Sequence, residues 1–134
     1  MPYISWEPSL SVGVPALDEQ HRAFIQVLND LHDTLMGGEF HEVVRARDRT
    51  LEGIESYVRS HFAAEEQFMA SIGYPLLAEH RRLHQEFTAR IRGYRATIAA
   101  GEQVLNSDLV KTMIRWVRDH LATEDRKYAV FAAG

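Results

Sequence analysis

The stretch from residue 51 to residue 73, LEGIESYVRSHFAAEEQFMASIG, carries a stripe of residues spaced three and four positions apart. The stripe consists of Leu51, Ile54, Val58, His61, Glu65, Phe68 and Ile72. This spacing keeps side chains on one face of an α-helix, and Gly73 ends the pattern. The stripe predicts a buried helix face, although that face carries a histidine and a carboxylate one turn apart.

Three further stretches have the same 4-3 rhythm. The first runs from Pro15 to Gly37-Gly38 with the stripe Leu17, His21, Phe24, Leu28, Leu31 and Leu35. Another runs from Pro75 to Gly101 with the stripe His80, His84, Phe87, Ile91, Tyr94 and Ile98. The last has Ser107 as its expected N-cap and the stripe Leu109, Met113, Trp116 and His120. Helices are therefore predicted over about 15–36, 40–72, 75–100 and 107–131, and no strand-like alternation competes with them.

Four helices with short connections predict an all-α fold, an antiparallel up-down-up-down four-helix bundle. Residues 1–14 are expected to form an N-terminal arm that lies across the bundle. A chain of 134 residues can bury a core without disulfides, so residues 1–134 are interpreted as one domain.

Composition excludes several kinds of site and partner. The chain has no cysteine, so a metal would be held by nitrogen and oxygen. Its net charge is −4, and its nearest basic run, RARDR at 45–49, is interrupted by Asp48 and is interpreted as a solvated helix face. We therefore expect no nucleic-acid partner. No stretch resembles a signal peptide or a membrane span, so a cytoplasmic location is expected.

The polar residues of the four stripes fall at one depth. In an antiparallel bundle the first and third helices begin at the end where the second and fourth finish. Counting from the helix ends places His21, His61, Glu65, His80, His84 and His120 in one layer, roughly 8–17 Å from that end. A single buried histidine is usually a hydrogen-bonded core residue. Five at one depth favour a metal site, because each unpaired buried polar group would cost about 1–3 kcal/mol.

The number of donors favours two ions bridged by carboxylate. Imidazole and carboxylate together suit iron or manganese, and ligand type alone leaves zinc and copper open. His32 and His41 match no position in the layer and are interpreted as surface histidines.

Four motifs resemble those of the hemerythrin family, in particular the bacterial hemerythrins. They are LDEQH (17–21), HFAAEE (61–66), EHRRLH (79–84) and WVRDHLATED (116–125). Trp6 ahead of VGVPALDEQH is similar to that family's N-terminal arm. The resemblance implies two irons: one held by three histidines, the other by two, with two carboxylates and an oxo or hydroxo group as bridges. The residues at the matching positions are His80, His84 and His120 for the first iron, His21 and His61 for the second, and Glu65 and Asp125 for the bridges.

Helix geometry and the resemblance disagree over the second carboxylate. Asp125 lies five residues after His120, about 140° around an ideal helix, whereas Glu124 is only about 40° away. The resemblance implies Asp125, which requires a local distortion of the last helix or an approach from its flank.

The resemblance implies reversible O₂ binding, for carriage, storage or delivery. O₂ would bind as hydroperoxide on the second iron, which has one open position. Phe24, Phe62, Trp116 and Leu121 are interpreted as an apolar O₂ pocket, although ordinary core packing also accounts for them. Such a pocket offers few protons, so an oxygen-binding protein is expected and not an enzyme. The expected partners are O₂ and an oxygen-using enzyme or a reductase, and a monomer is favoured.

Two rival functions stay open: a di-iron enzyme that reduces peroxide or nitric oxide or oxidises a small substrate, and a stand-alone oxygen or redox sensor. Ferritin-like iron storage is disfavoured because the chain lacks the E-x-x-H motif. A structural zinc site is disfavoured because it needs only four ligands.

Several residues are candidates for holding the ligands in place. Tyr128 lies about one turn beyond Asp125. Asp18, Gln20, Glu66 and Glu79 could orient ligand imidazoles or could equally be surface residues, and for Glu66 and Glu79 a surface position is the favoured interpretation.

Overall fold

The structure, a computed structural model, describes residues 4–37, 40–101 and 107–134. Within the helices, it does not describe the side chains of residues 34–37, 40–50 and 107–110. The predictions for Leu35, His41, the RARDR run, the Ser107 cap and Leu109 therefore lie outside the described side chains.

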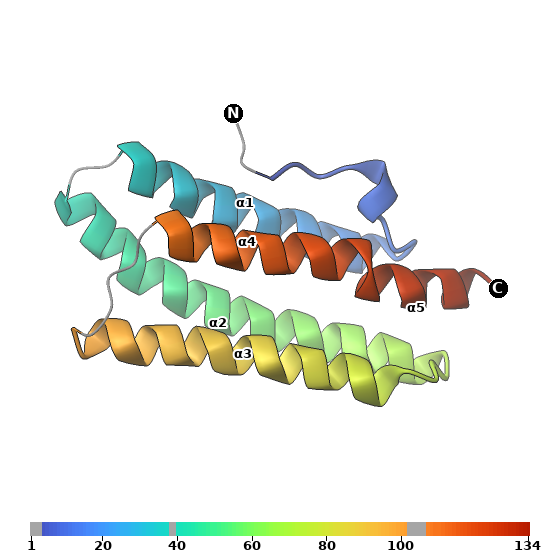
Figure 1. The fold of residues 1–134 in the computed structure, drawn as a ribbon. Coiled ribbons are helices and arrows are strands. Elements are labelled where there is room, and N and C mark those ends of the chain that lie inside the picture. Colours follow the sequence, from blue (N-terminus) through green and yellow to red (C-terminus); the bar gives the residue numbers. More distant parts are fainter. Residues whose placement is uncertain (1–3, 38–39, 102–106) are drawn as a thin grey trace.

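Helices account for most of the described chain, and these residues contain no strand. They are η1 (Pro8–Leu10), α1 (Pro15–Gly37), α2 (Phe40–Ser71), α3 (Leu77–Ala99), α4 (Ser107–Ala122) and α5 (Glu124–Ala133). Figure 1 shows α1, α2, α3 and α4 lying side by side and running in alternating directions, with α5 continuing the line of α4. The predicted all-α, antiparallel four-helix bundle with an N-terminal arm is confirmed. None of the described helices is long and apolar enough to cross a membrane.

The second and third helices are joined by a tight, hydrogen-bonded turn. Gly73 has a φ of 67°, and the amides of Gly73 and Tyr74 donate to the carbonyls of Ala70 and Met69 at 3.2 and 3.0 Å. This is the Schellman arrangement that ends a helix. Because Pro75 belongs to this turn, α3 begins at Leu77, two residues later than the sequence predicts.

Two apolar clusters fill the bundle, and the polar layer lies between them. The larger cluster includes Phe24, Phe62 and Leu121, whereas the smaller one, near the beginning of α1, includes Leu17 and Tyr128. Along α1, His21 therefore falls between Leu17 of one cluster and Phe24 of the other. The two apolar clusters therefore separate the polar layer from water at both ends along the bundle axis.

Two side chains of α1 hold the arm against the bundle. The Asn29 amide accepts a hydrogen bond from the Ile4 amide at 3.0 Å and donates one to the Ile4 carbonyl at 2.7 Å. The Asp18 carboxylate accepts from the Ser11 hydroxyl at 2.5 Å and from the Val12 amide at 2.9 Å. The contacts of Asp18 thus position the arm.

Candidate metal centre

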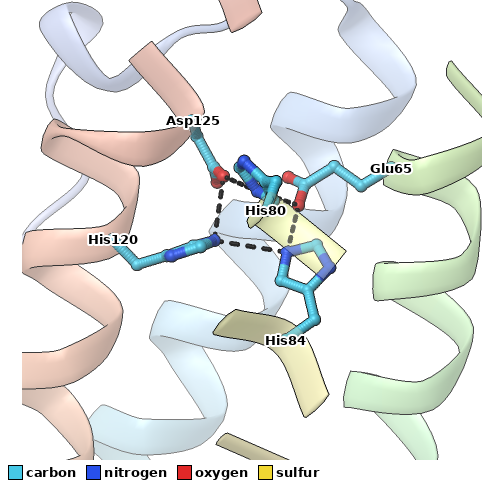
Figure 2. Close-up of side chains that lie close together, drawn as sticks. All are labelled: Glu65, His80, His84, His120 and Asp125. Carbon is cyan, nitrogen blue, oxygen red and sulfur yellow. Dashed lines mark hydrogen bonds and ion pairs between the residues drawn. The ribbon is translucent and has the colours of Figure 1, made fainter. Parts of the chain in front are cut away.

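The bundle brings seven predicted site residues into one buried cluster. His21 comes from α1, His61 and Glu65 from α2, His80 and His84 from α3, His120 from α4 and Asp125 from α5. Even His120, the most accessible of them, is only 7% exposed. Figure 2 shows Glu65, His80, His84, His120 and Asp125 pointing toward one another from α2, α3, α4 and α5. Their ligand-type atoms lie within 4.8 Å of one another, as do those of His21, His61 and Glu65.

The Glu65 carboxylate divides its two oxygens between two groups of histidines. Its Oε2 lies 3.0 Å from His21 Nε2 and 3.3 Å from His61 Nε2. Its Oε1 lies 3.0 Å from His84 Nε2 and 3.6 Å from His80 Nε2. One carboxylate thus faces both groups, as a bridging ligand between two ions would.

Asp125 divides its oxygens in the same way. Its Oδ1 lies 3.0 Å from Nε2 of both His80 and His120, and its Oδ2 lies 3.3 Å from His21 Nε2. The two carboxylates therefore face the same two sets of nitrogens: His21 with His61, and His80 with His84 and His120.

Buried atoms without hydrogen bonds indicate that this cluster fits metal ions. They include Oε1 of Glu65, Nε2 of His80 and both carboxylate oxygens of Asp125. Several imidazole nitrogens lie about 3 Å away, but not in hydrogen-bonding geometry. Buried polar atoms are normally paired, so lone pairs that converge without partners suit a cation. Nitrogen and oxygen donors of this kind fit iron or manganese.

Helix α4 ends between His120 and Asp125, and this break allows both side chains to enter the site. Thr123 has φ −115° and ψ −67°, and this φ departs from the ideal helical value of about −63°. Its amide and its hydroxyl both donate to the Asp119 carbonyl, at 3.0 and 2.5 Å. A hydroxyl bonded to the carbonyl four residues earlier commonly bends a helix. The fourth helix predicted over 107–131 is therefore interrupted.

Three side chains outside the cluster hold its members in place. The Nδ1 atoms of His61 and His84 donate to Gln20 Oε1 at 2.6 Å and to Glu66 Oε2 at 3.0 Å. These bonds leave Nε2 of each ring free to offer its lone pair. The Tyr128 hydroxyl donates to Glu65 Oε2 at 2.9 Å.

The surface interpretation of Glu66 is wrong, because Glu66 connects His84 to Arg81 Nε, 2.9 Å away. Glu79 is exposed, as expected. Asp18 instead bonds the arm, and the partly buried His32 belongs to neither group of candidate ligands.

Aromatic rings lie against several imidazoles. Phe62 stacks on His84 with ring centroids 3.7 Å apart, and Trp116 stacks on His120 at 4.5 Å. Phe24 and Leu121 are buried, and Phe24 stacks on Tyr57 at 4.9 Å. Tyr57, which the sequence interpretation overlooked, stacks on His61 at 5.6 Å. Its position four residues before His61 could have identified it, since residues four apart are neighbours on a helix.

Without metal, protons balance the buried carboxylates. Burial lowers the pKa values of His21 and His80, but the carboxylates of Asp125 and Glu65 beside them outweigh burial and raise both to about 9. Burial raises the pKa of Glu65, but the four imidazoles beside the carboxylate outweigh burial and hold this pKa well below its ordinary value. The cluster therefore favours positive charge at its centre.

Comparison with known proteins identifies relatives along almost the whole chain. The model of the hemerythrin HHE cation binding domain matches residues 12–132. A bacteriohemerythrin of Stenotrophomonas maltophilia (strain R551-3) is 36% identical over 96% of this chain and 81% of its own length. A bacteriohemerythrin of Pseudomonas aeruginosa (strain LESB58) is 31% identical over 96% of this chain and 80% of its own length. A myohemerythrin of Theromyzon tessulatum is 27% identical over 95% of this chain and 91% of its own length.

Solved structures share the fold. A wild-type hemerythrin crystal structure superposes with a TM-score of 0.84 at 26% identity and covers 95% of each chain. A mutant hemerythrin gives a TM-score of 0.86 at 27% identity and covers 96% of each chain.

Proposed function

This chain belongs to the hemerythrin family, and from that premise we propose that it binds O₂ reversibly at a non-haem di-iron centre. The observation that carries the proposal is that each of the two carboxylates directs its two oxygens toward different histidines. Glu65 and Asp125 each direct one oxygen toward His21 and the other toward the histidines of α3. A site for one ion would not need two carboxylates that each face two sets of nitrogens.

Seven residues would hold the two ions. His80, His84 and His120 would bind one iron, His21 and His61 the other, and Glu65 and Asp125 would bridge them with an oxo or hydroxo group. The unequal number of imidazoles would leave an open position on the side of His21 and His61. When bound, the irons would supply the electrons and the coordination site that O₂ requires. The finer proposal is that O₂ is held there as hydroperoxide.

The surrounding side chains keep the centre intact and dry. Tyr128 holds Glu65 by its hydroxyl, while Gln20 and Glu66 hold imidazoles by their Nδ1 atoms. Phe62 and Trp116 cover imidazole faces with apolar rings, and Phe24 and Leu121 extend the apolar surroundings. Few groups in these surroundings can deliver protons, which favours release of O₂ over its reduction. We therefore propose an O₂ carrier, store or delivery protein and not an enzyme.

We propose a single domain that acts as a cytoplasmic monomer. Its partners would be a reductase that returns oxidised iron to the ferrous state, or an enzyme that uses the delivered O₂.

Anaerobic loading with ferrous iron, exposure to O₂ and then degassing test the proposal. A charge-transfer band that appears with O₂ and disappears on degassing, with two irons per chain, is the expected result. Permanent conversion to the ferric form, or steady turnover of peroxide or nitric oxide with a reductant, would instead favour a di-iron enzyme.

A further inference from the structure

Tyr57 is a polar residue in contact with the proposed open side of the centre. It lies on α2 one turn before His61, and its ring is nearly parallel to the His61 ring, with an angle of 17° and a centroid distance of 5.6 Å. Phe24, three residues after His21 on α1, stacks on the same tyrosine at 4.9 Å and 15°. The tyrosine ring is therefore held by one candidate ligand and by one residue of the proposed pocket.

The hydroxyl of Tyr57 has no protein partner within the described part of the chain. Its oxygen is buried and makes no hydrogen bond, a property that it shares with atoms of His21, Glu65, His80 and Asp125. Leaving a buried hydroxyl unpaired is unfavourable, so such a group calls for a partner that the chain does not supply. For the candidate ligands that partner is a cation, whereas a hydroxyl beside them requires an acceptor.

The hydroxyl is suited to donate. A phenolic hydroxyl carries its proton at neutral pH, because the ordinary pKa of the group is about 10. A donor held in apolar surroundings favours an acceptor that carries negative charge, because bonds to charged groups are stronger than bonds to neutral ones.

We propose that Tyr57 is a specificity-determining residue that donates a hydrogen bond to a small anionic ligand, of the azide, nitrite or peroxide class, in the space beside His21 and His61. The proposal rests on the proposed function, which places the open position on that side. The Tyr57 hydroxyl would make the site prefer anions to neutral molecules of similar size. A water molecule as the permanent acceptor is the competing possibility, and the test distinguishes the two.

The matched substitutions Tyr57→Phe and Tyr94→Phe test this assignment. Both delete one phenolic hydroxyl and keep the ring, but Tyr94 lies on α3 ten residues beyond His84, about 15 Å along the helix. The probe is azide, titrated into the iron-loaded, oxidised proteins and followed by its charge-transfer absorption. Tyr57→Phe should weaken azide binding roughly tenfold, and Tyr94→Phe should leave it unchanged.

Ultraviolet resonance Raman spectra supply a direct view of the hydroxyl. Azide should shift a tyrosine band toward the donor state in the parent protein and in Tyr94→Phe, and this shift should be absent in Tyr57→Phe. Equal azide affinities in the parent and Tyr57→Phe proteins, or a donor-state contribution in the azide-free parent spectrum that is missing from Tyr57→Phe, would overturn the assignment in favour of a bound water.

The proposed function and the role of Tyr57 can be tested separately, because the proposed function depends on whether O₂ binding is reversible. Azide affinities that differ between the two variants, in a protein that does not release O₂, would support the role of Tyr57 and contradict the carrier. Reversible O₂ binding with equal azide affinities would contradict only the role of Tyr57.

Discussion

Asp125 and Glu124 are neighbours in the chain, yet only the Asp125 carboxylate enters the cluster. Asp125 is 1% exposed and its Oδ1 lies 3.0 Å from His120 Nε2. The Glu124 side chain is 27% exposed and lies 3.1 Å from Lys127 Nζ. The break at Thr123 separates the two carboxylates, because it changes the rotation of the chain between His120 and residue 125.

Replacing each carboxylate in turn tests which one completes the centre. Asp125→Ala should reduce the iron content below two per chain, because it removes the proposed bridge. Glu124→Ala should keep two irons, since it removes only a partly exposed ion pair. Iron analysis after anaerobic loading measures both, and the reverse pattern would show that Glu124 is the ligand.

Tyr128→Phe tests the bond that holds Glu65. Tyr128 is fully buried, and its hydroxyl donates to Glu65 Oε2 at 2.9 Å. Because the ring remains, the substitution removes one hydrogen bond from a buried carboxylate and should lower the free energy of unfolding of the metal-free protein by about 1–3 kcal/mol. Urea denaturation measures the change. Tyr74→Phe, at the same end of the bundle, is the control, and an equal loss in the control would argue against a specific role of the Tyr128 hydroxyl.

Glu66 and Glu86 form a matched pair for testing support of the ligands. Each pairs with an arginine of α3, at 2.9 Å with Arg81 and at 2.6 Å with Arg82, but only Glu66 also contacts an imidazole. Glu66→Ala should weaken iron binding by about 10–100-fold, because His84 loses the acceptor that orients its ring. Glu86→Ala should have no effect in a chelator competition assay. Similar affinities in the two variants would place Glu66 among ordinary surface residues.

The metal-free protein should be most stable in mildly acidic solution. The pKa values of His21 and His80 are raised to about 9 in the folded chain, compared with about 6.5 when unfolded. Their contribution is therefore complete below pH 6.5 and disappears as the pH rises through 9. The pKa values of Glu65 and Asp125 are lowered because the imidazoles around them outweigh burial, so their contribution is lost in acid.

Denaturant unfolding of the metal-free protein at pH 5.5 and 9.5 measures this dependence. A loss of at least about 2 kcal/mol is expected at the higher pH. His80→Gln should reduce the difference between the two values. A free energy of unfolding that does not change across this range would contradict the charge balance inferred for the cluster.

The affinity for iron should have the opposite pH dependence from the stability of the metal-free protein. Metal-bound imidazoles are neutral, so iron must displace the protons that His21 and His80 carry at neutral pH. Loading in weakly buffered solution should therefore release protons, and iron affinity should increase from pH 6 to pH 8. Proton release is measured with an indicator dye, and loading without any release would show that these imidazoles are already neutral.

The helices and the shared depth of the polar residues could be predicted from sequence because both depend on local regularities. The spacing of Leu51, Ile54 and Val58 indicates a helix face without reference to any other part of the chain. A constant rise per residue then converts positions along four helices into one depth, which brings His21, His61, His80 and His120 together. The residues around this layer could not be predicted from helix periodicity in the same way: Glu66 was interpreted as a surface residue, and Tyr57 was overlooked.

The sequence by itself therefore determined four amphipathic helices, the depth of their polar residues and the resemblance to a family. Tertiary structure decided between Asp125 and Glu124, directed Asp18 to the arm and joined Glu66 to His84. The physical reason is that an ideal helix assigns each residue a fixed direction. A break such as that at Thr123, or a contact between helices, depends on hydrogen bonds and packing that form only when the bundle closes.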